Sequence, residues 1–280
     1  MTVLLQVSDP HFGTERPEVV AALERLVHDL RPGVLLLSGD ITQRATAAQF
    51  ATARAFVDRL AVPIVLAIPG NHDIPLFNLA GRLFSPYSHY ARAFGGSLEP
   101  EHQNSDVLVL AVNTTRWYRH ADGEVSAAQI KRVAHRLEAA RPAQWRIVVV
   151  HQPIAVTREQ DRHNLLHGHE AAARRWAAAG ADMVVGGHIH LPFVLPLRER
   201  WPDLPRAIWA VQAGTAVSSR VRADAGNSVN VFRLGADLAA TDAVEQVALR
   251  RCVVERWDHG AATQRFERVS VHEVRSGDKQ

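Results

Sequence analysis

Short apolar runs alternate with helix-length amphipathic segments along the first two thirds of the chain, and this alternation restricts the fold more than any other feature. The runs cover residues 3–7, 34–37, 64–68, 107–112, 147–150 and 183–185. Nearly continuous apolar runs of this length predict strands that are buried on both faces. Strands that alternate with helices predict a largely parallel sheet in an α/β fold.

The segments between these runs have the spacing of amphipathic helices. Helices are predicted over residues 17–30, 47–60, 126–139 and 168–179, with Pro17 in a first turn and Ser126 as an N-cap. Beyond Pro192 the pattern changes, because strands are predicted at 207–211, 228–234, 244–254 and 263–274 without helices between them. A second, more antiparallel sheet is therefore expected. No linker-like stretch divides the chain, so residues 1–280 are predicted to form one domain, with residues 192–280 mainly completing the second sheet.

The composition limits the kinds of site that the chain can form. It has fifteen histidines but a single cysteine, Cys252, which excludes a disulfide framework and a thiolate zinc site. A bound metal would therefore need nitrogen and oxygen ligands. The net charge of +3 comes with interspersed acids and no basic stripe, so a nucleic-acid partner is not expected. The chain shows neither a signal-peptide pattern nor an apolar stretch that could span a membrane, which predicts a cytoplasmic location.

Metal-competent side chains follow nearly every early strand. They are Asp9 and His11, then Asp40, then Asn71, His72 and Asp73, then His151, and finally His188 and His190. In open α/β sheets, ligands bind in the crevice outside the carboxyl ends of the strands, so these five groups are expected to converge. Asp9 and His11 are two residues apart, as are His188 and His190, and in extended chain both members of such a pair project to one side. Carboxylates, imidazoles and one amide favour Mn, Fe, Zn or Ni over Ca²⁺ or Mg²⁺.

The order Asp-x-His, Gly-Asp, Gly-Asn-His-Asp, strand-end His and Gly-His-x-His resembles the calcineurin-like metallophosphoesterase superfamily. Within it, the Ser-Asp-Pro-His-Phe-Gly opening and Gly-Asn-His-Asp-Ile-Pro are most similar to bacterial class III cyclic nucleotide phosphodiesterases. The resemblance implies a four-layer α/β/β/α sandwich with two stacked mixed sheets. This agrees with the parallel and then antiparallel pattern of predicted strands.

The same resemblance implies a binuclear metal centre. One ion would be held by Asp9, His11, Asp40 and His190, and the other by Asp40, Asn71, His151 and His188, so that Asp40 bridges them. Mn, Fe or Zn ions about 3.5–4 Å apart can activate a bridging hydroxide for in-line attack on a phosphoester. His72 would stabilise charge or protonate the leaving group. Asp73 would either orient His72 or cap the following turn.

Three further segments are candidates for contact with a substrate. His163, with His167 and His169, either lines a substrate groove or belongs to an ordinary solvated loop, and a third metal there is disfavoured. Arg220 ends a run of small residues, and either Arg220 or Arg222 could form a bidentate contact with a phosphate. Residues 76–94 are amphipathic and either cap the site or face a membrane surface or a partner.

The function expected from these features is hydrolysis of a small phosphodiester, such as a cyclic nucleotide. A phosphomonoesterase, a protein phosphatase or a nuclease of the same superfamily is the alternative among enzymes. A metal-binding scaffold without catalysis is the alternative from a different class. The sequence leaves the oligomeric state open, with a homodimer among the options.

Overall fold

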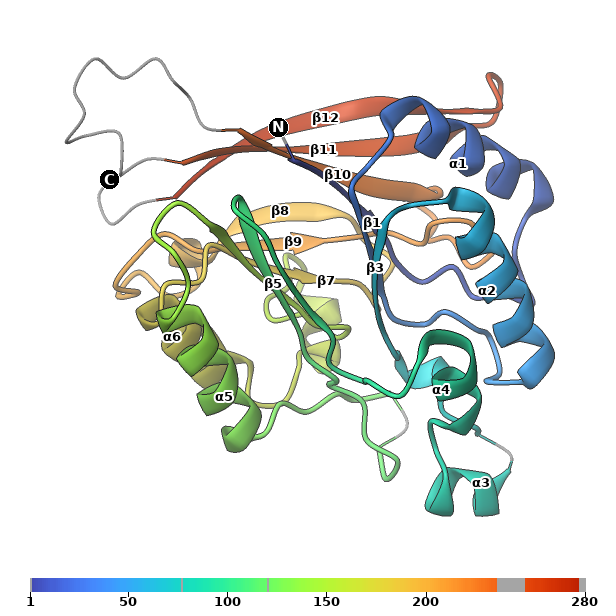
Figure 1. Ribbon diagram of the computed structural model, residues 1–280, viewed down its shortest axis with the longest axis horizontal. Helices are drawn as coiled ribbons and strands as arrows, with labels where there is room; N and C mark the ends of the chain where they lie inside the picture. Colours follow the sequence, from blue (N-terminus) through green and yellow to red (C-terminus); the bar gives the residue numbers. More distant parts are fainter. Residues whose placement is uncertain (1, 77, 120, 236–249, 277–280) are drawn as a thin grey trace.

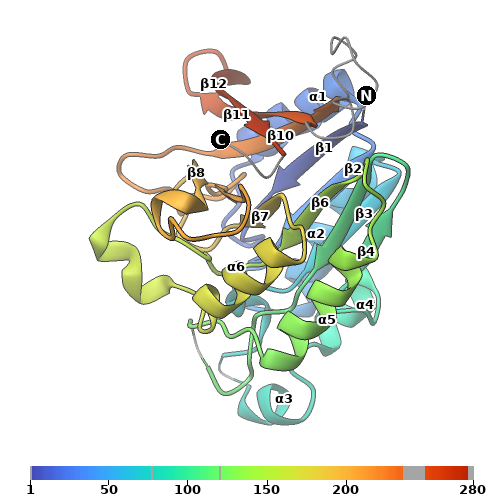
Figure 2. The same cartoon turned by 90° about the vertical axis from the view of Figure 1, so that its left-hand side faces the viewer.

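Two six-stranded sheets stack face to face, and helices cover both outer faces (Figures 1 and 2). The computed structural model describes residues 2–76, 78–119, 121–235 and 250–276. Helices α1 (Pro17–Leu30) and α2 (Ala47–Leu60) cover the first sheet, whereas α5 (Ala127–Glu138) and α6 (His169–Ala178) cover the second. The predicted four-layer α/β/β/α sandwich is confirmed.

Each sheet combines parallel strands with antiparallel ones. The first sheet has the order β12-β11-β10-β1-β2-β3 and the second has the order β4-β5-β6-β7-β9-β8. The first sheet contains β1 (Thr2–Val7), β2 (Val34–Ser38), β3 (Ile64–Ile68), β10 (Ser228–Gly235), β11 (Arg251–Gly260) and β12 (Arg265–Arg275). The second contains β4 (Glu101–Gln103), β5 (Val107–Ala111), β6 (Trp145–Val149), β7 (Met183–Gly186), β8 (Phe193–Pro196) and β9 (Trp209–Gln212). Strands β1, β2 and β3 run parallel, as do β5, β6, β7 and β9, so their carboxyl ends face one edge of the sandwich.

The C-terminal strands are divided between the two sheets, which corrects the prediction that residues 192–280 mainly complete the second sheet. Only β8 and β9 join that sheet, whereas β10, β11 and β12 extend the first sheet through antiparallel pairing of β10 with β1. Strand β10 is buried on both faces: Val231 packs toward the helices and Phe232 toward the other sheet. Of the strand predicted at 244–254, residues 244–249 lie outside the described residues, and the rest begins β11.

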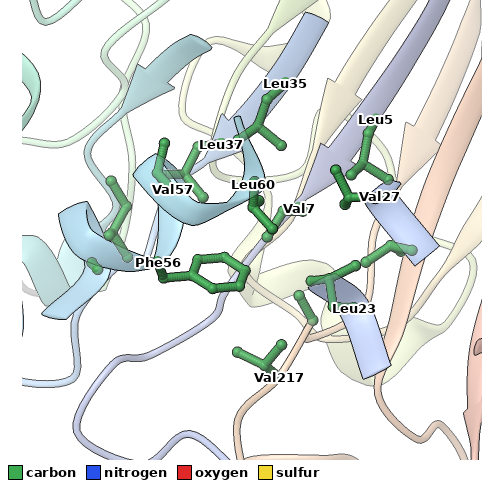
Figure 3. Close-up of a cluster of buried hydrophobic side chains, with 14 of the residues drawn as sticks. Leu5, Val7, Leu23, Val27, Leu35, Leu37, Phe56, Val57, Leu60 and Val217 are labelled. Atoms are coloured by element: carbon green, nitrogen blue, oxygen red, sulfur yellow. The ribbon is translucent and has the colours of Figure 1, made fainter. Parts of the chain in front are cut away.

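The hydrophobic core has one layer between the two sheets and one layer between each sheet and the helices that cover it. Residues of both sheets, including Leu36, Val109 and Phe232, form the layer between them. The layer under the first pair of helices is shown in Figure 3, where Leu23 and Val27 of α1 and Phe56 of α2 pack on the sheet. The side chains that they meet are Leu5 and Val7 of β1 and Leu35 and Leu37 of β2.

Several local signals in the sequence act as predicted. Helix α1 begins at Pro17, and α5 begins after Ser126, whose hydroxyl accepts a hydrogen bond from the backbone N–H of Gln129 at 3.2 Å.

Short 3-10 helices lie at η1 (Asn71–Asp73), η2 (Glu159–Asn164) and η3 (Leu197–Glu199). Within the part of the chain that the structure describes, no helix is both long and apolar enough to cross a membrane.

The amphipathic stretch at 76–94 forms two short helices, α3 (Leu79–Phe84) and α4 (Ser88–Phe94). Figure 1 shows α4 beside the carboxyl end of β3 and α3 farther out, below α4. The hydroxyl of the buried Tyr90 donates a hydrogen bond of 2.6 Å to the carbonyl of Ala67, which fixes α4 to that strand. The segment is thus placed next to the strand ends where the polar clusters follow.

Candidate metal centre

The structure brings all seven predicted metal ligands into one cluster at the carboxyl ends of the parallel strands. Among the residues that the structure describes, three overlapping groups could hold a metal ion, namely Asp9 with His11 and His190, His11 with Asp40 and His72, and Asp40 with His151 and His188. Asn71 joins the last group, because its Oδ1 lies 3.2 Å from Nε2 of His151. The cluster collects side chains that follow β1, β2, β3, β6 and β7.

Asp40 lies between the two halves of this cluster. Its Oδ2 faces one half, at 3.7 Å from Nε2 of His11, and its Oδ1 faces the other, at 3.3 Å from Nε2 of His151. In the first half, Nε2 of His190 lies 3.3 Å from Oδ1 of Asp9 and 3.1 Å from Nε2 of His11. One carboxylate therefore joins two separate sets of nitrogen and oxygen donors.

Burial or neighbouring charges lower the pKa values of Asp9, His11 and His188. Burial would raise the pKa of Asp9, but the hydrogen bond and charge of His190 outweigh burial and lower that pKa to about 2. Burial lowers the pKa of His11 to about 3 and that of His188 to about 4. Near neutral pH, Asp9 is therefore ionised and these two imidazoles are neutral, which are the states that bind metals.

Hydrogen bonds to the backbone fix the orientation of two imidazoles. Nδ1 of His151 lies 2.9 Å from the carbonyl of Ser38, and Nδ1 of His190 lies 2.6 Å from the carbonyl of Arg220. A carbonyl can only accept, so each Nδ1 carries the proton and each Nε2 faces the cluster. Ligand histidines usually show this arrangement. Among the described residues, Nδ1 of His11 and Nδ1 of His188 are buried without a hydrogen-bond partner. The residues present therefore fit a metal site.

The backbone at the cluster is strained. Nine non-glycine residues have a positive φ within the described ranges, and five of them belong to the cluster, namely Asp9, His11, Asp40, His188 and His190. Such conformations cost of the order of 1 kcal/mol or more each and concentrate at functional sites. Two glycines allow the strands to approach so closely: a Cβ at Gly39 would collide with the ring of His151, and one at Gly70 with Asp40.

His72 and Arg220, predicted separately as catalytic and substrate-binding, contact each other. Nδ1 of His72 lies 3.0 Å from the carbonyl of Gln43, and a guanidinium nitrogen of Arg220 lies 3.0 Å from Nε2 of His72. The carbonyl only accepts and the guanidinium only donates, so His72 carries its proton on Nδ1 in this arrangement. The backbone N–H of His72 donates to Oδ1 of Asp40 at 2.8 Å. His72 is thus held beside the midpoint of the cluster.

Asp73 does not orient His72, which corrects one of its two predicted roles. Its buried carboxylate accepts hydrogen bonds of 2.8–2.9 Å from the backbone N–H groups of Ile41, Thr42 and Gly70 and from the hydroxyl of Thr42. Burial raises the pKa of Asp73 to about 6, and the charge of Asp40 adds to this. Asp73 therefore ties the loop after β2 to the turn after β3, which are the loops that carry Asp40 and Asn71.

Replacement of Asp73 by asparagine is expected to lower the free energy of unfolding by about 2–4 kcal/mol, because an amide NH₂ would face N–H donors in a buried place. Urea unfolding monitored by circular dichroism measures this change. Asp29, whose side chain is 78% exposed, gives the matched control Asp29→Asn, for which about 0.5 kcal/mol or less is expected. An Asp73→Asn midpoint equal to that of the wild type would contradict the structural role.

The structure does not bring His163 to the cluster. It is exposed on η2, and within the described residues no hydrogen bond, ion pair or ring contact joins it to the metal-competent side chains. Nε2 of His167 lies 3.7 Å from Asp122, and Nδ1 of His169 lies 2.8 Å from the carbonyl of Leu166. These three histidines therefore belong to the loop before α6 and to its first turn.

Sequence reasoning missed Gln43, which contacts both His72 and Arg220. Its carbonyl holds His72, and its side-chain oxygen accepts a hydrogen bond of 3.1 Å from Arg220. A glutamine three residues after Asp40 lies in the same loop, and this proximity is the only signal that the sequence offers. The contact of Arg220 with His72 had no signal, since these residues are 148 positions apart.

Residues 2–192 match the family described as calcineurin-like phosphoesterase. This stretch is more than half of the chain and contains the whole cluster, so the protein belongs to the calcineurin-like phosphoesterase family. Membership in this family implies a metal-dependent phosphoesterase. Comparison with curated protein sequences finds no match.

Solved structures with similar folds include enzymes and one anchoring protein. The purple acid phosphatase PPD1 from yellow lupin seeds has a TM-score of 0.70 and 11% identity over 99% of this chain, which spans 54% of the lupin chain, about half its length. A dimetal phosphatase from Danio rerio has a TM-score of 0.63 and 12% identity, with 98% of each chain covered. GAP50, the anchor in the inner membrane complex of Plasmodium, has a TM-score of 0.58 and 11% identity over 100% of this chain and 90% of its own. At these identities the likeness shows the fold alone.

Proposed function

We propose that this protein hydrolyses a small phosphodiester with two metal ions held by the cluster. One ion would be bound by Asp9, His11, Asp40 and His190, and the other by Asp40, Asn71, His151 and His188. The observation that carries this proposal is the position of Asp40, whose two carboxylate oxygens face different sets of donors. The nitrogen-rich donor set suits Mn, Fe or Zn.

Two ions at such a site supply Lewis acidity and lower the pKa of bound water toward neutrality. The chain's own residues would then bind and orient the phosphoester. Arg220 contacts His72 through its guanidinium, which is suited to bind an unesterified phosphate oxygen. The ring of His72 is held by the carbonyl of Gln43, and its Nε2, which accepts from Arg220 in this arrangement, would have to carry a proton to stabilise charge or to serve the leaving oxygen.

Metal binding is expected to release protons and to strengthen with pH. Burial opposes the charge on His151, but the carboxylate of Asp40 outweighs burial and raises the pKa of His151 to about 9. Below that pH the imidazole is protonated, and it must lose its proton to bind a metal. Apparent Mn²⁺ affinity should therefore rise about tenfold per pH unit between pH 6.5 and 8.5. Calorimetry in buffers of different ionisation enthalpy measures the release, and heats that are independent of the buffer would contradict it.

Turnover of bis(p-nitrophenyl) phosphate with added Mn²⁺, compared with p-nitrophenyl phosphate, tests the proposal. The diester is expected to be hydrolysed faster by the wild type, and Asn71→Ala should remove most of this turnover. Faster cleavage of the monoester would favour the phosphomonoesterase alternative. No metal-stimulated turnover of any phosphoester would favour a scaffold. A panel of 3′,5′-cyclic, 2′,3′-cyclic and linear nucleotides tests the similarity to class III cyclic nucleotide phosphodiesterases.

A further inference from the structure

A cavity of about 310 Å³ lies beside the metal cluster, on the side of His72. Its lining residues are Gln43, Arg44, Asn71, His72, Ile74, Leu76 and Arg82. Asn71 and His72 also belong to the candidate site, so the cavity lies next to the place where a phosphoester would react. Its volume is in the range of small-molecule sites.

Arg82 of α3 is held at this cavity by neutral groups. Its guanidinium donates to the backbone carbonyls of Trp117 at 2.7 Å, Arg119 at 2.8 Å and Pro75 at 3.3 Å. A guanidinium has five N–H donors, so two of them are left by these three bonds. Within the described residues no carboxylate pairs with Arg82. The side chain is therefore fixed in position and keeps its full positive charge.

The cavity also has an apolar wall, and no acidic residue among the described ones lines it. Ile74 is buried and Leu76 is 37% exposed, and both come from the segment that leads into α3. None of the seven lining residues is an aspartate or a glutamate. On the side of the metal cluster, His72 and Gln43 hold the guanidinium of Arg220. A group that carries a negative charge beside an apolar body is complementary to such a lining.

We propose that this cavity is the leaving-group subsite and that it selects phosphodiesters whose leaving group carries its own negative charge beside an apolar or aromatic body. This proposal rests on the proposed function. In the hydrolysis, the oxygen of water forms a bond to phosphorus and the P–O bond to the leaving group breaks. A proton of that water ends on the leaving oxygen. Arg82 takes no part in these bond changes and acts on the charge of the departing group.

A pair of substrates that differ only in this charge tests the subsite. Methyl 4-carboxyphenyl phosphate releases an anionic phenol, and methyl 4-carbamoylphenyl phosphate releases a neutral phenol of the same size. The measured quantity is kcat/KM for the carboxyphenyl ester divided by kcat/KM for the carbamoylphenyl ester, determined with the Mn²⁺-loaded full chain. Arg82→Lys and Arg82→Gln both lose the fork of carbonyl contacts, but only lysine keeps the charge. A purely structural role of Arg82 would change the rates for both substrates together and leave the ratio as it was.

The ratio is expected to fall about tenfold in Arg82→Gln relative to the wild type and to stay within about threefold in Arg82→Lys. Arg92→Gln is the matched control, because Arg92 is exposed on α4 in the same segment and does not line the cavity. An unchanged ratio in Arg82→Gln, or equal ratios in the Gln and Lys variants, would overturn the subsite. If the wild type cleaved neither these esters nor bis(p-nitrophenyl) phosphate, the proposed function itself would fail.

Discussion

Asp40→Asn is expected to lower kcat for a phosphodiester by at least about a thousandfold, because one residue serves both halves of the metal cluster. The two carboxylate oxygens of Asp40 face His11 and His151. An amide offers one oxygen and no charge, so one half of the cluster loses its shared anionic ligand. Asparagine is the appropriate substitution, because Asp40 has a φ of 48° and asparagine tolerates that conformation better than alanine.

Elemental analysis of the Asp40→Asn protein should find fewer than two ions per chain. The matched control is Asp58→Asn on α2, where the side chain is 55% exposed and pairs with Arg54. This control should keep wild-type turnover and metal content. An Asp40→Asn protein with two bound ions and turnover within tenfold of the wild type would contradict the bridging role.

His72→Gln is expected to lower kcat by about a hundredfold to ten-thousandfold while two metal ions stay bound. Glutamine cannot exchange a proton, but its backbone N–H can still donate to Asp40 as that of His72 does. Steady-state kinetics and elemental analysis of the same samples measure both effects. Loss of one ion would instead identify His72 as a ligand, since it also lies within reach of His11 and Asp40.

Arg220→Gln gives a useful comparison in the same assay. The guanidinium of Arg220 contacts His72, whereas the backbone carbonyl of Arg220 contacts His190. A substitution removes the first contact and keeps the second. The guanidinium is proposed to bind the phosphate, so the variant should raise KM more than it lowers kcat. The backbone contact that orients His190 is kept, and the metal content should therefore stay at two ions.

The sequence predicted the strand ends and their polar residues because those signals are local. Buried strands appear as continuous apolar runs, and a polar group such as Asp40 or His151 directly after such a run must lie at the edge of the sheet. Once the strands are parallel, these edges coincide. The geometry of the cluster thus follows from residues that are close to their strands.

Features that depend on distant contacts could not be predicted in this way. The sequence predicts a strand at residues 228–234, but it does not reveal that β10 pairs with β1 and so extends the first sheet. Asp73 follows His72 in the sequence, yet its carboxylate turns toward Thr42 in another loop. Likewise, only the packing of the loop after β9 brings Arg220 to His72. The prediction that the chain forms one domain stays a prediction.

Titration of the metal-free protein with Mn²⁺ tests the central claim most directly, when bound ions per chain and turnover of bis(p-nitrophenyl) phosphate are measured on the same samples. The proposed centre predicts that binding saturates at two ions per chain and that turnover reaches its maximum only as the second ion binds. Full turnover with one ion, or no turnover with two ions bound, would contradict a binuclear hydrolytic centre built around Asp40.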